Sequence, residues 1–177
     1  MRYFVLLIFS FSIHLVCGQV GQEFPQIETE TISNEVVKIP AAFSGNYSLI
    51  GIGTSKKAED DLRTWQAPIY HKFVAKTGLM DQMYDVKIGF LPLFTGAARM
   101  AKDKVVKKLR ENNEKLVVDH VYVYSGDREP FKSIGIDDKT EPYFLLLDPN
   151  GKVVWYTSGK FRQKYLDEIE EVLNQEI

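Results

Sequence analysis

Three consecutive acids, Glu59, Asp60 and Asp61, are the first residues in this chain whose type and spacing could do chemistry. Neighbouring carboxyl groups can act as a general acid and a general base. The same residues fall early in a predicted helix, where the positive end of the helix dipole stabilises acidic side chains at a solvated surface. We therefore favour a structural role for them. The alternative is an enzyme that uses Lys57, Asp60 or Arg63 for catalysis rather than a cysteine thiol. A strongly shifted pKa of one of these side chains inside a closed pocket would support it.

Metal and cysteine chemistry find little support in the sequence. His71 and His120 are too few and too far apart to indicate a metal site. The acidic stretch from Asp137 to Glu141 lacks the spacing and the glycine of a calcium loop. The chain has one cysteine, Cys17, and it falls in a predicted leader, so the mature chain would have no thiol for disulfide exchange or nucleophilic attack. We expect no metal and no cofactor.

The first 18 residues differ from the rest of the chain. Arg2 precedes an apolar run at 3–16, which a small-residue cleavage site follows. The run is shorter than the roughly 20 residues that a membrane-spanning helix needs. We interpret residues 1–18 as a secretory signal peptide and expect the domain at 19–177 to be exported, to a periplasm or to the medium. A lipoprotein acylated at Cys17 is the alternative.

The composition is that of a globular protein of one domain. The 177 residues are 45% hydrophobic and carry a formal net charge of −2. So small a charge argues against nucleic acid as the main ligand and against adhesion to membranes by bulk charge. No internal repeat, low-complexity tract or linker divides the chain, and we expect a monomer.

The stretch from Leu49 to Pro68 organises the predicted fold. A short apolar run with two glycines at 49–53 predicts a buried strand that ends in a tight turn. Helical spacing follows, with Leu62, Trp65 and Ile69 on one side. Pro68 lies inside that helical pattern and should kink it.

The remaining segments predict one α/β domain. Strand–helix–strand units should build a partly parallel sheet with helices on both faces, and a closing hairpin makes the sheet mixed. Further strands are expected at 24–27, 36–40, 86–94, 117–124, 143–147 and 152–156, and further helices at 96–113 and 162–175.

This order of elements resembles the thioredoxin-like fold in its extended form, with an N-terminal β-hairpin as in peroxiredoxins and membrane-anchored thiol–disulfide oxidoreductases. The resemblance places Pro142 where that fold has its cis-proline. The first cysteine of the redox pair would fall near Lys57 if counted from the strand, or near Asp60 if counted back from Pro68. Neither position carries sulfur.

Within this fold, six short stretches carry a closer resemblance: Phe24-Pro25, Leu49–Ile52, Thr64–Pro68, Phe144–Asp148, Gly151–Trp155 and Ser158-Gly159. They resemble the mitochondrial ATP synthase assembly-factor family, which is thioredoxin-like and lacks the catalytic cysteine pair. The resemblance implies a redox-inactive binding or assembly role, whereas a degenerate oxidoreductase or peroxiredoxin relative is the alternative. The predicted secretory leader is a difference from this family, whose members are mitochondrial.

A protein partner is expected at the groove that redox relatives use to grip an extended peptide. The resemblance implies that this groove is lined by Lys56, Lys57, Trp65, Pro142 and Tyr143. For Trp65, burial of its large ring against the sheet is the structural alternative.

A second candidate surface is the polar face of the predicted helix at 96–113. It carries Arg99, Lys102, Lys107 and Arg110 among its cations. A solvated helix face is the simpler interpretation. The alternative is docking of an acidic partner or of anionic lipid head groups, which would bring the protein close to a membrane.

Overall fold

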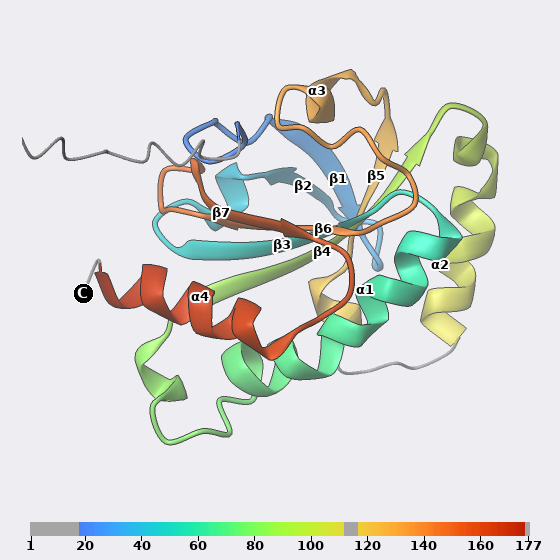
Figure 1. The fold of residues 1–177 in the computed structure, drawn as a ribbon. Helices are drawn as coiled ribbons and strands as arrows, with labels where there is room; N and C mark the ends of the chain where they lie inside the picture. The colour runs from blue at the N-terminus through green and yellow to red at the C-terminus, as the bar shows by residue number, and fades with distance from the viewer. Residues whose placement is uncertain (1–17, 112–116, 176–177) are drawn as a thin grey trace, which may run out of the picture.

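The computed structural model describes residues 18–111 and 117–175, and the segment with Cys17 and most of the predicted signal peptide lies outside them. The described residues form a seven-stranded sheet in the order β2-β1-β5-β4-β3-β6-β7. Helices cover both of its faces (Figure 1). The predicted α/β class with a central mixed sheet and an N-terminal hairpin is confirmed.

The strands and helices follow the predicted alternation except in two places: β1 begins only where the strand predicted at 24–27 ends, and the short helix α3 was not predicted. The strands are β1 (Ile27–Thr31), β2 (Val36–Ile39), β3 (Tyr47–Gly53), β4 (Val86–Thr95), β5 (Tyr122–Gly126), β6 (Tyr143–Leu147) and β7 (Val153–Ser158). The α-helices are α1 (Lys56–Ile69), α2 (Lys102–Glu111), α3 (Glu129–Lys132) and α4 (Gln163–Gln175). Short helical segments are η1 (Ala41–Phe43), η2 (Tyr70–Val74), η3 (Asp81–Met83), η4 (Gly96–Ala101) and η5 (Val118–His120).

Three parallel strands form the centre of the sheet. Strand β4 pairs with β3 on one side and with β5 on the other, and helices α1 and α2 make the crossovers that parallel pairs require. Strands β6 and β7 extend the sheet antiparallel beyond β3. The β1–β2 hairpin joins it beyond β5.

The core lies on both faces of the sheet. On one face, Trp65 of α1, Val106 of α2 and Ile169 of α4 pack against the central strands. On the other face, Phe131 of α3 and Phe24 of the N-terminal segment belong to a second cluster. Figure 1 shows α1 and α4 on one side of the sheet and α3 on the other.

The predicted kink at Pro68 takes the form of a change in helix type. Proline has no N–H to donate and disturbs the carbonyl four residues back, which weakens the α-helical ladder. Helix α1 ends at Ile69, and the π-helix η2 follows at once, where the Ala75 N–H donates to the Tyr70 carbonyl at 2.8 Å.

The prediction of one α-helix over 96–113 is wrong in its first part. The segment begins as the 3₁₀-helix η4 and becomes the α-helix α2 only at Lys102. A 3₁₀-helix has about three residues per turn, so it shifts the phase of the apolar stripe. Val106 is buried, whereas Ala98 and Ala101 are exposed.

None of the helices described in 18–111 and 117–175 is both long and apolar enough to span a membrane.

Candidate functional site

Ser55 fixes the turn between β3 and α1, where the fold resemblance places the redox pair. Its Oγ accepts a hydrogen bond from the Ala58 N–H at 3.2 Å and so caps α1. The same hydroxyl donates to the carbonyl oxygen of Lys139 in the loop before β6. The serine therefore ties the start of the helix to the neighbouring loop.

Arg128 holds that loop from the opposite side. Its Nη2 donates to the carbonyl oxygens of Ile136 at 3.2 Å, Asp137 at 2.5 Å and Asp138 at 3.1 Å. A guanidinium has five donors and stays charged, which suits it to collect several carbonyls. The loop is thus fixed by one side chain that no sequence pattern singled out.

The polar groups of the loop are satisfied within it. The Asp138 N–H donates to the Tyr143 hydroxyl at 2.9 Å, and burial raises the pKa of that phenol. The Thr140 N–H donates to Asp138 Oδ1 at 2.7 Å. This backbone hydrogen bond, with a smaller contribution from the charge of Lys57, lowers the pKa of the Asp138 carboxyl. The Asp138 carboxylate therefore helps to shape the loop.

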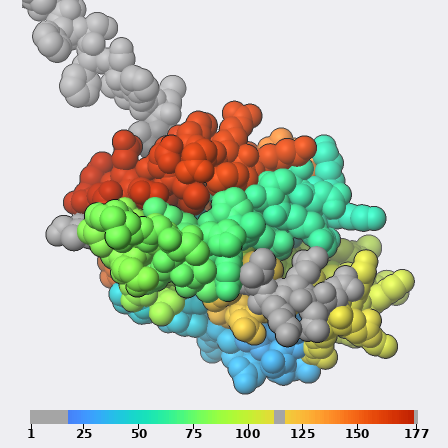
Figure 2. All heavy atoms as spheres, turned by 90° about the horizontal axis from the view of Figure 1, so that it is seen from below, coloured from blue at the N-terminus to red at the C-terminus, as the bar shows by residue number. Residues whose placement is uncertain are grey.

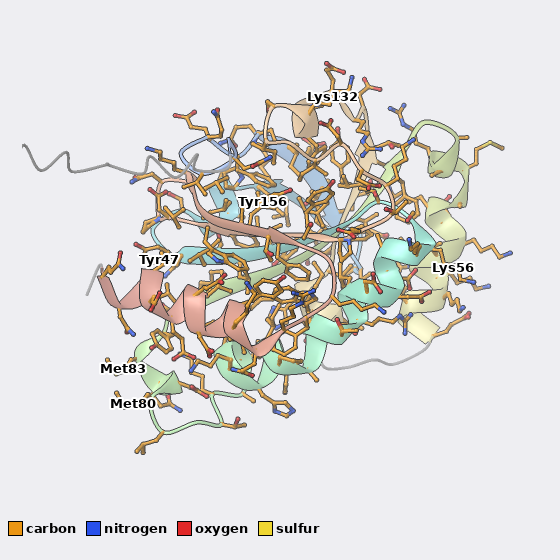
Figure 3. All side chains as sticks on the ribbon, viewed as in Figure 1. Tyr47, Lys56, Met80, Met83, Lys132 and Tyr156 are labelled. Carbon is orange, nitrogen blue, oxygen red and sulfur yellow. The ribbon has the colours of Figure 1, made fainter. Side chains whose placement is uncertain are left out.

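The structure corrects three of the five residues predicted to line a partner groove. The side chains of Trp65, Pro142 and Tyr143 are buried and cannot form a surface that a partner contacts. Lys56 and Lys57 are exposed at the start of α1, and Figure 3 labels Lys56 there. A binding role for these two lysines stays a prediction.

Trp65 belongs to the aromatic core beneath the turn. Its ring stacks on Phe144, with ring centroids 3.9 Å apart, and on Tyr165 at 5.3 Å. The indole Nε1 donates to the Gly159 carbonyl at 2.9 Å. The Gly159 N–H donates to the Pro142 carbonyl at 3.0 Å, so the two buried residues are joined through one glycine.

The expected cis-proline is not at Pro142. In the described residues the cis peptide bond joins Ile39 to Pro40, and the bond before Pro142 is trans. Pro142 directly precedes the buried strand β6, but its peptide bond is not the cis bond that the resemblance implied.

The acids at the start of α1 form ordinary surface ion pairs. Glu59 lies 2.8 Å from Arg63 one helical turn later, and Asp61 lies 3.7 Å from Lys160. Asp60 is exposed. These contacts agree with a solvated helix start rather than an acid–base pair.

Two hollows on the described part of the chain lie away from these residues. One, of about 360 Å³, lies at the β6–β7 turn beside Phe43, Ser48 and Asp148. The other, of about 320 Å³, lies between β1 and β5. Neither hollow is lined by Lys57 or Asp60, so neither is the closed pocket that catalysis by these side chains would need.

Metal ligation finds no support among the described residues. Within 18–111 and 117–175, no cluster of three or more His, Cys, Asp or Glu side chains could hold an ion. His71 is exposed. His120 is half-buried, and burial lowers the pKa of its imidazole.

The predicted basic face is largely engaged by the chain itself. Lys102 Nζ lies 2.7 Å from Glu30 of β1. Arg110 donates through Nε to the Ile32 carbonyl at 2.7 Å and through Nη2 to Asn34 Oδ1 at 2.6 Å. Helix α2 therefore fastens the turn of the β1–β2 hairpin.

The other two cations of this face are also paired. Arg99 donates to the Gly126 carbonyl at 3.1 Å and to Asp127 Oδ1 at 2.6 Å. Lys107 lies 3.9 Å from Glu111 at the exposed surface. Docking of an acidic partner or of anionic lipid would have to compete with these contacts.

An apolar tip follows η2 that the sequence reasoning missed. Leu79 is 94% exposed, and Met80 and Met83 are 56% and 51% exposed. The tip is fixed, because Asp81 in its centre is buried and lies 2.8 Å from Lys72. In Figure 3 the two labelled methionines project at the end of the molecule away from Lys56.

The face that carries this tip is formed by helices. Figure 2 shows α4 and α1 side by side, with the segment after α1 continuing beside α4. Lys72 also lies 2.6 Å from Glu170, which ties the tip to α4.

The comparisons with solved structures show the thioredoxin fold. The thioredoxin domain of a thiol-disulfide oxidoreductase from Bacteroides vulgatus aligns over 86% of this chain and 96% of its own, with 17% identity and a TM-score of 0.58. A 2-Cys peroxiredoxin from Plasmodium vivax aligns over 89% and 98%, with 15% identity and a TM-score of 0.59. BsSco, a member of the Sco family of cytochrome c oxidase assembly proteins, aligns over 88% and 94%, with 14% identity and a TM-score of 0.57.

None of the curated proteins matches this chain. The profile of the ATP10 protein family matches residues 19–175, which is nearly all of the predicted mature domain. The resemblance inferred from the sequence is confirmed, and the chain belongs to the ATP10 protein family of ATP synthase assembly factors.

Proposed function

We propose that this protein is a redox-inactive binding factor that assists the assembly of a partner protein. The observation that carries the proposal is the state of the β3–α1 turn. Ser55 stands at the head of α1 and uses its hydroxyl both to cap the helix and to bind the next loop. No residue after Cys17 can supply the thiolate that disulfide exchange requires.

Two exposed features could serve such a role. Lys56 and Lys57 project at the start of α1, and the apolar tip at Leu79, Met80 and Met83 projects elsewhere. Contiguous exposed apolar side chains on a soluble domain commonly mark interaction sites. BsSco, which is named as an assembly protein, supports the view that this fold can serve assembly.

We propose further that the domain acts outside the cytoplasm. The apolar run at 3–16 with Arg2 before it supports a signal peptide. Mass spectrometry of the native N-terminus tests this: a free or cyclised Gln19 is expected, an acylated Cys17 would show a lipoprotein, and an intact Met1 would contradict cleavage.

Redox inactivity is tested with the full chain carrying Cys17→Ser and with the chain that begins at Gln19. Reduction of insulin by dithiothreitol and turnover of hydrogen peroxide should both proceed at the rate without protein. Thioredoxin and a 2-Cys peroxiredoxin serve as positive controls. Activity that survives the loss of Cys17 would overturn the proposal.

Binding is tested with a photo-crosslinking residue in place of Lys57. Lys108, also exposed but on α2, is the matched control position. A defined adduct from position 57 in the native compartment, and none from position 108, is expected. Adducts of equal yield from both positions would contradict a partner surface at the α1 turn.

A further inference from the structure

The sheet has a gap between β1 and β5. These antiparallel strands pair at Thr31↔Tyr122 and at Glu30↔Val123, and their register stops there. Both strands nevertheless continue past that point, β1 toward its start and β5 toward its end. The ladder is therefore complete at one end and open at the other.

The backbone groups at the open end can be identified from the alternation of the ladder. The Thr31 N–H donates to the Glu35 carbonyl across the β1–β2 turn at 2.8 Å, so alternate residues from Thr31 bond to β2 and those between them face β5. After Glu30, the next residue of β1 that faces β5 is Glu28, and its partner in register would be Ser125. That pair is not formed.

A hollow of about 320 Å³ opens where the pair is missing. Glu28 lines one side of it and Ser125 the other, while Gly126 and Pro130 close its end near α3. Glu28 and Ser125 are both exposed, so the hollow reaches the surface.

Side chains from the neighbouring helices hold the two strands in their places. Lys102 binds Glu30 and Arg110 binds the hairpin turn, so α2 fastens β1 at its paired end. Arg99 donates to the carbonyl of Gly126 and fastens the end of β5 separately.

We propose that this gap binds an extended segment of a partner protein, which enters between β1 and β5 with a basic residue beside Glu28. Each strand offers one residue, Glu28 or Ser125, whose backbone groups face the gap and can pair with another strand. Side-chain contacts then select the sequence of that strand. Glu28 supplies the negative charge that would attract the partner's basic residue. None of the ion pairs formed among the described residues includes it, although Lys38 is its partner in the β1–β2 register.

The gap is distinct from the turn at the start of α1. The inference rests on the proposed binding role for its biological meaning, but not on redox inactivity. Turnover of insulin or peroxide would refute the proposed function and leave the gap untouched, whereas the two measurements below test the gap alone.

Hydrogen exchange of the free protein tests whether the gap exists. The amides of Glu28 and Ser125 should exchange roughly tenfold faster or more than those of Thr29 and Val123, which are bonded within the ladder. Equal protection at all four amides would show a complete ladder and overturn the proposal.

A peptide titration followed by NMR tests the occupant. The probe is a seven-residue peptide of alternating lysine and valine, added up to about 1 mM. Its binding should shift and protect the amides of Glu28 and Ser125. The same peptide with alternate amides N-methylated, and the one with glutamate for lysine, should each bind at least roughly tenfold more weakly, because they lack the backbone donors or the charge.

Two variants locate the contact. Glu28→Arg should weaken the lysine peptide by roughly tenfold or more. Glu35→Arg makes the same change of charge on the same hairpin outside the hollow, and it should bind as the natural chain does. Ser125→Pro removes an N–H that faces the gap and spares the β4 ladder, so it should abolish protection of the peptide.

Several results would overturn the proposal. These are no shift at Glu28 and Ser125 at the highest peptide concentration, equal binding of the N-methylated peptide, or equal losses in Glu28→Arg and Glu35→Arg. If Ser125→Pro fails to fold, the comparison of the two arginine variants decides the matter without it.

Discussion

Replacement of Trp65 separates a buried core residue from a partner-binding one. Its side chain has no exposed surface, stacks between Phe144 and Tyr165, and donates from Nε1 to the Gly159 carbonyl. A surface residue that grips a partner would have none of these constraints. Replacing Trp65 should therefore lower the stability of the folded domain and not only its binding to a partner.

The size of the response follows from these contacts. Trp65→Ala removes a fully buried aromatic side chain, which costs about 3–5 kcal/mol. Trp65→Phe keeps most of the apolar contact but leaves the Gly159 carbonyl without its donor, which costs about 1–3 kcal/mol. A domain is stable by about 5–15 kcal/mol, so the alanine variant could lose much of its folded population while the phenylalanine variant stays folded.

Urea unfolding of Trp65→Phe, followed by circular dichroism, measures this directly. With a urea dependence of about 2 kcal/mol per molar, a loss of about 2 kcal/mol lowers the midpoint by about 1 M. Lys57→Ala at the exposed surface is the control and should change stability by about 0.5 kcal/mol or less. If the urea midpoint of Trp65→Phe differed from that of the natural chain by no more than the midpoint of Lys57→Ala does, burial of Trp65 would be refuted.

Three further changes test local parts of the structure. The hydrogen bond from Lys72 lowers the pKa of the Asp81 carboxyl below its usual 3.8, so its stabilising effect is present above about pH 4 and is lost as the pH falls through the lowered value. Urea unfolding of Asp81→Asn should therefore show a smaller loss of stability between about pH 5 and pH 2 than the natural chain, and an equal loss would contradict the ion pair. Ser55→Ala removes the cap of α1 and should lower the melting temperature by about 2–4 °C, for a loss of about 1 kcal/mol, whereas no change in calorimetry would argue against the cap. Gly151→Ala should melt lower than Gly45→Ala, because both glycines have φ near +87° but an added Cβ at Gly151 would lie 2.8 Å from Pro40 and one at Gly45 would meet nothing within 4 Å; equal melting points would refute the close approach.

The central part of the fold could be predicted because its signals are local. The apolar run with two glycines, followed by helical spacing and Pro68, predicts β3 and the start of α1 close to where they are observed. The turn Asp148-Pro149-Asn150-Gly151 likewise marks the β6–β7 hairpin, since Gly151 has a φ of +87°. In each case the residues that decide the structure lie within a few positions of one another.

The candidate site could be predicted only in part, because its contacts join distant segments. The sequence allows Trp65 either to line the partner groove or to be buried against the sheet. Only the packing of β6 and α4 around its ring decides for burial. Ser55 follows the strand at 49–53 whose tight turn the sequence predicts, but its bond to Lys139 joins residues 84 apart in the chain. Arg128 carries no pattern that indicates three carbonyl partners.

The basic face illustrates how a surface of like charges can be structural. Its cations were considered for an outside partner, yet Lys102 and Arg110 bind Glu30 and the carbonyl of Ile32, both on or next to the hairpin. Helix α2 fastens the hairpin at the end where β1 pairs with β5 at Glu30, whereas the pair at Glu28 is not formed. The contacts of the basic face and the gap between β1 and β5 therefore belong to one arrangement, so weakening these contacts should change the pairing of the two strands. Lys102→Ala, which frees Glu30, should raise the exchange rate of the Val123 amide toward that of Ser125, and an unchanged rate would show that the gap does not depend on α2.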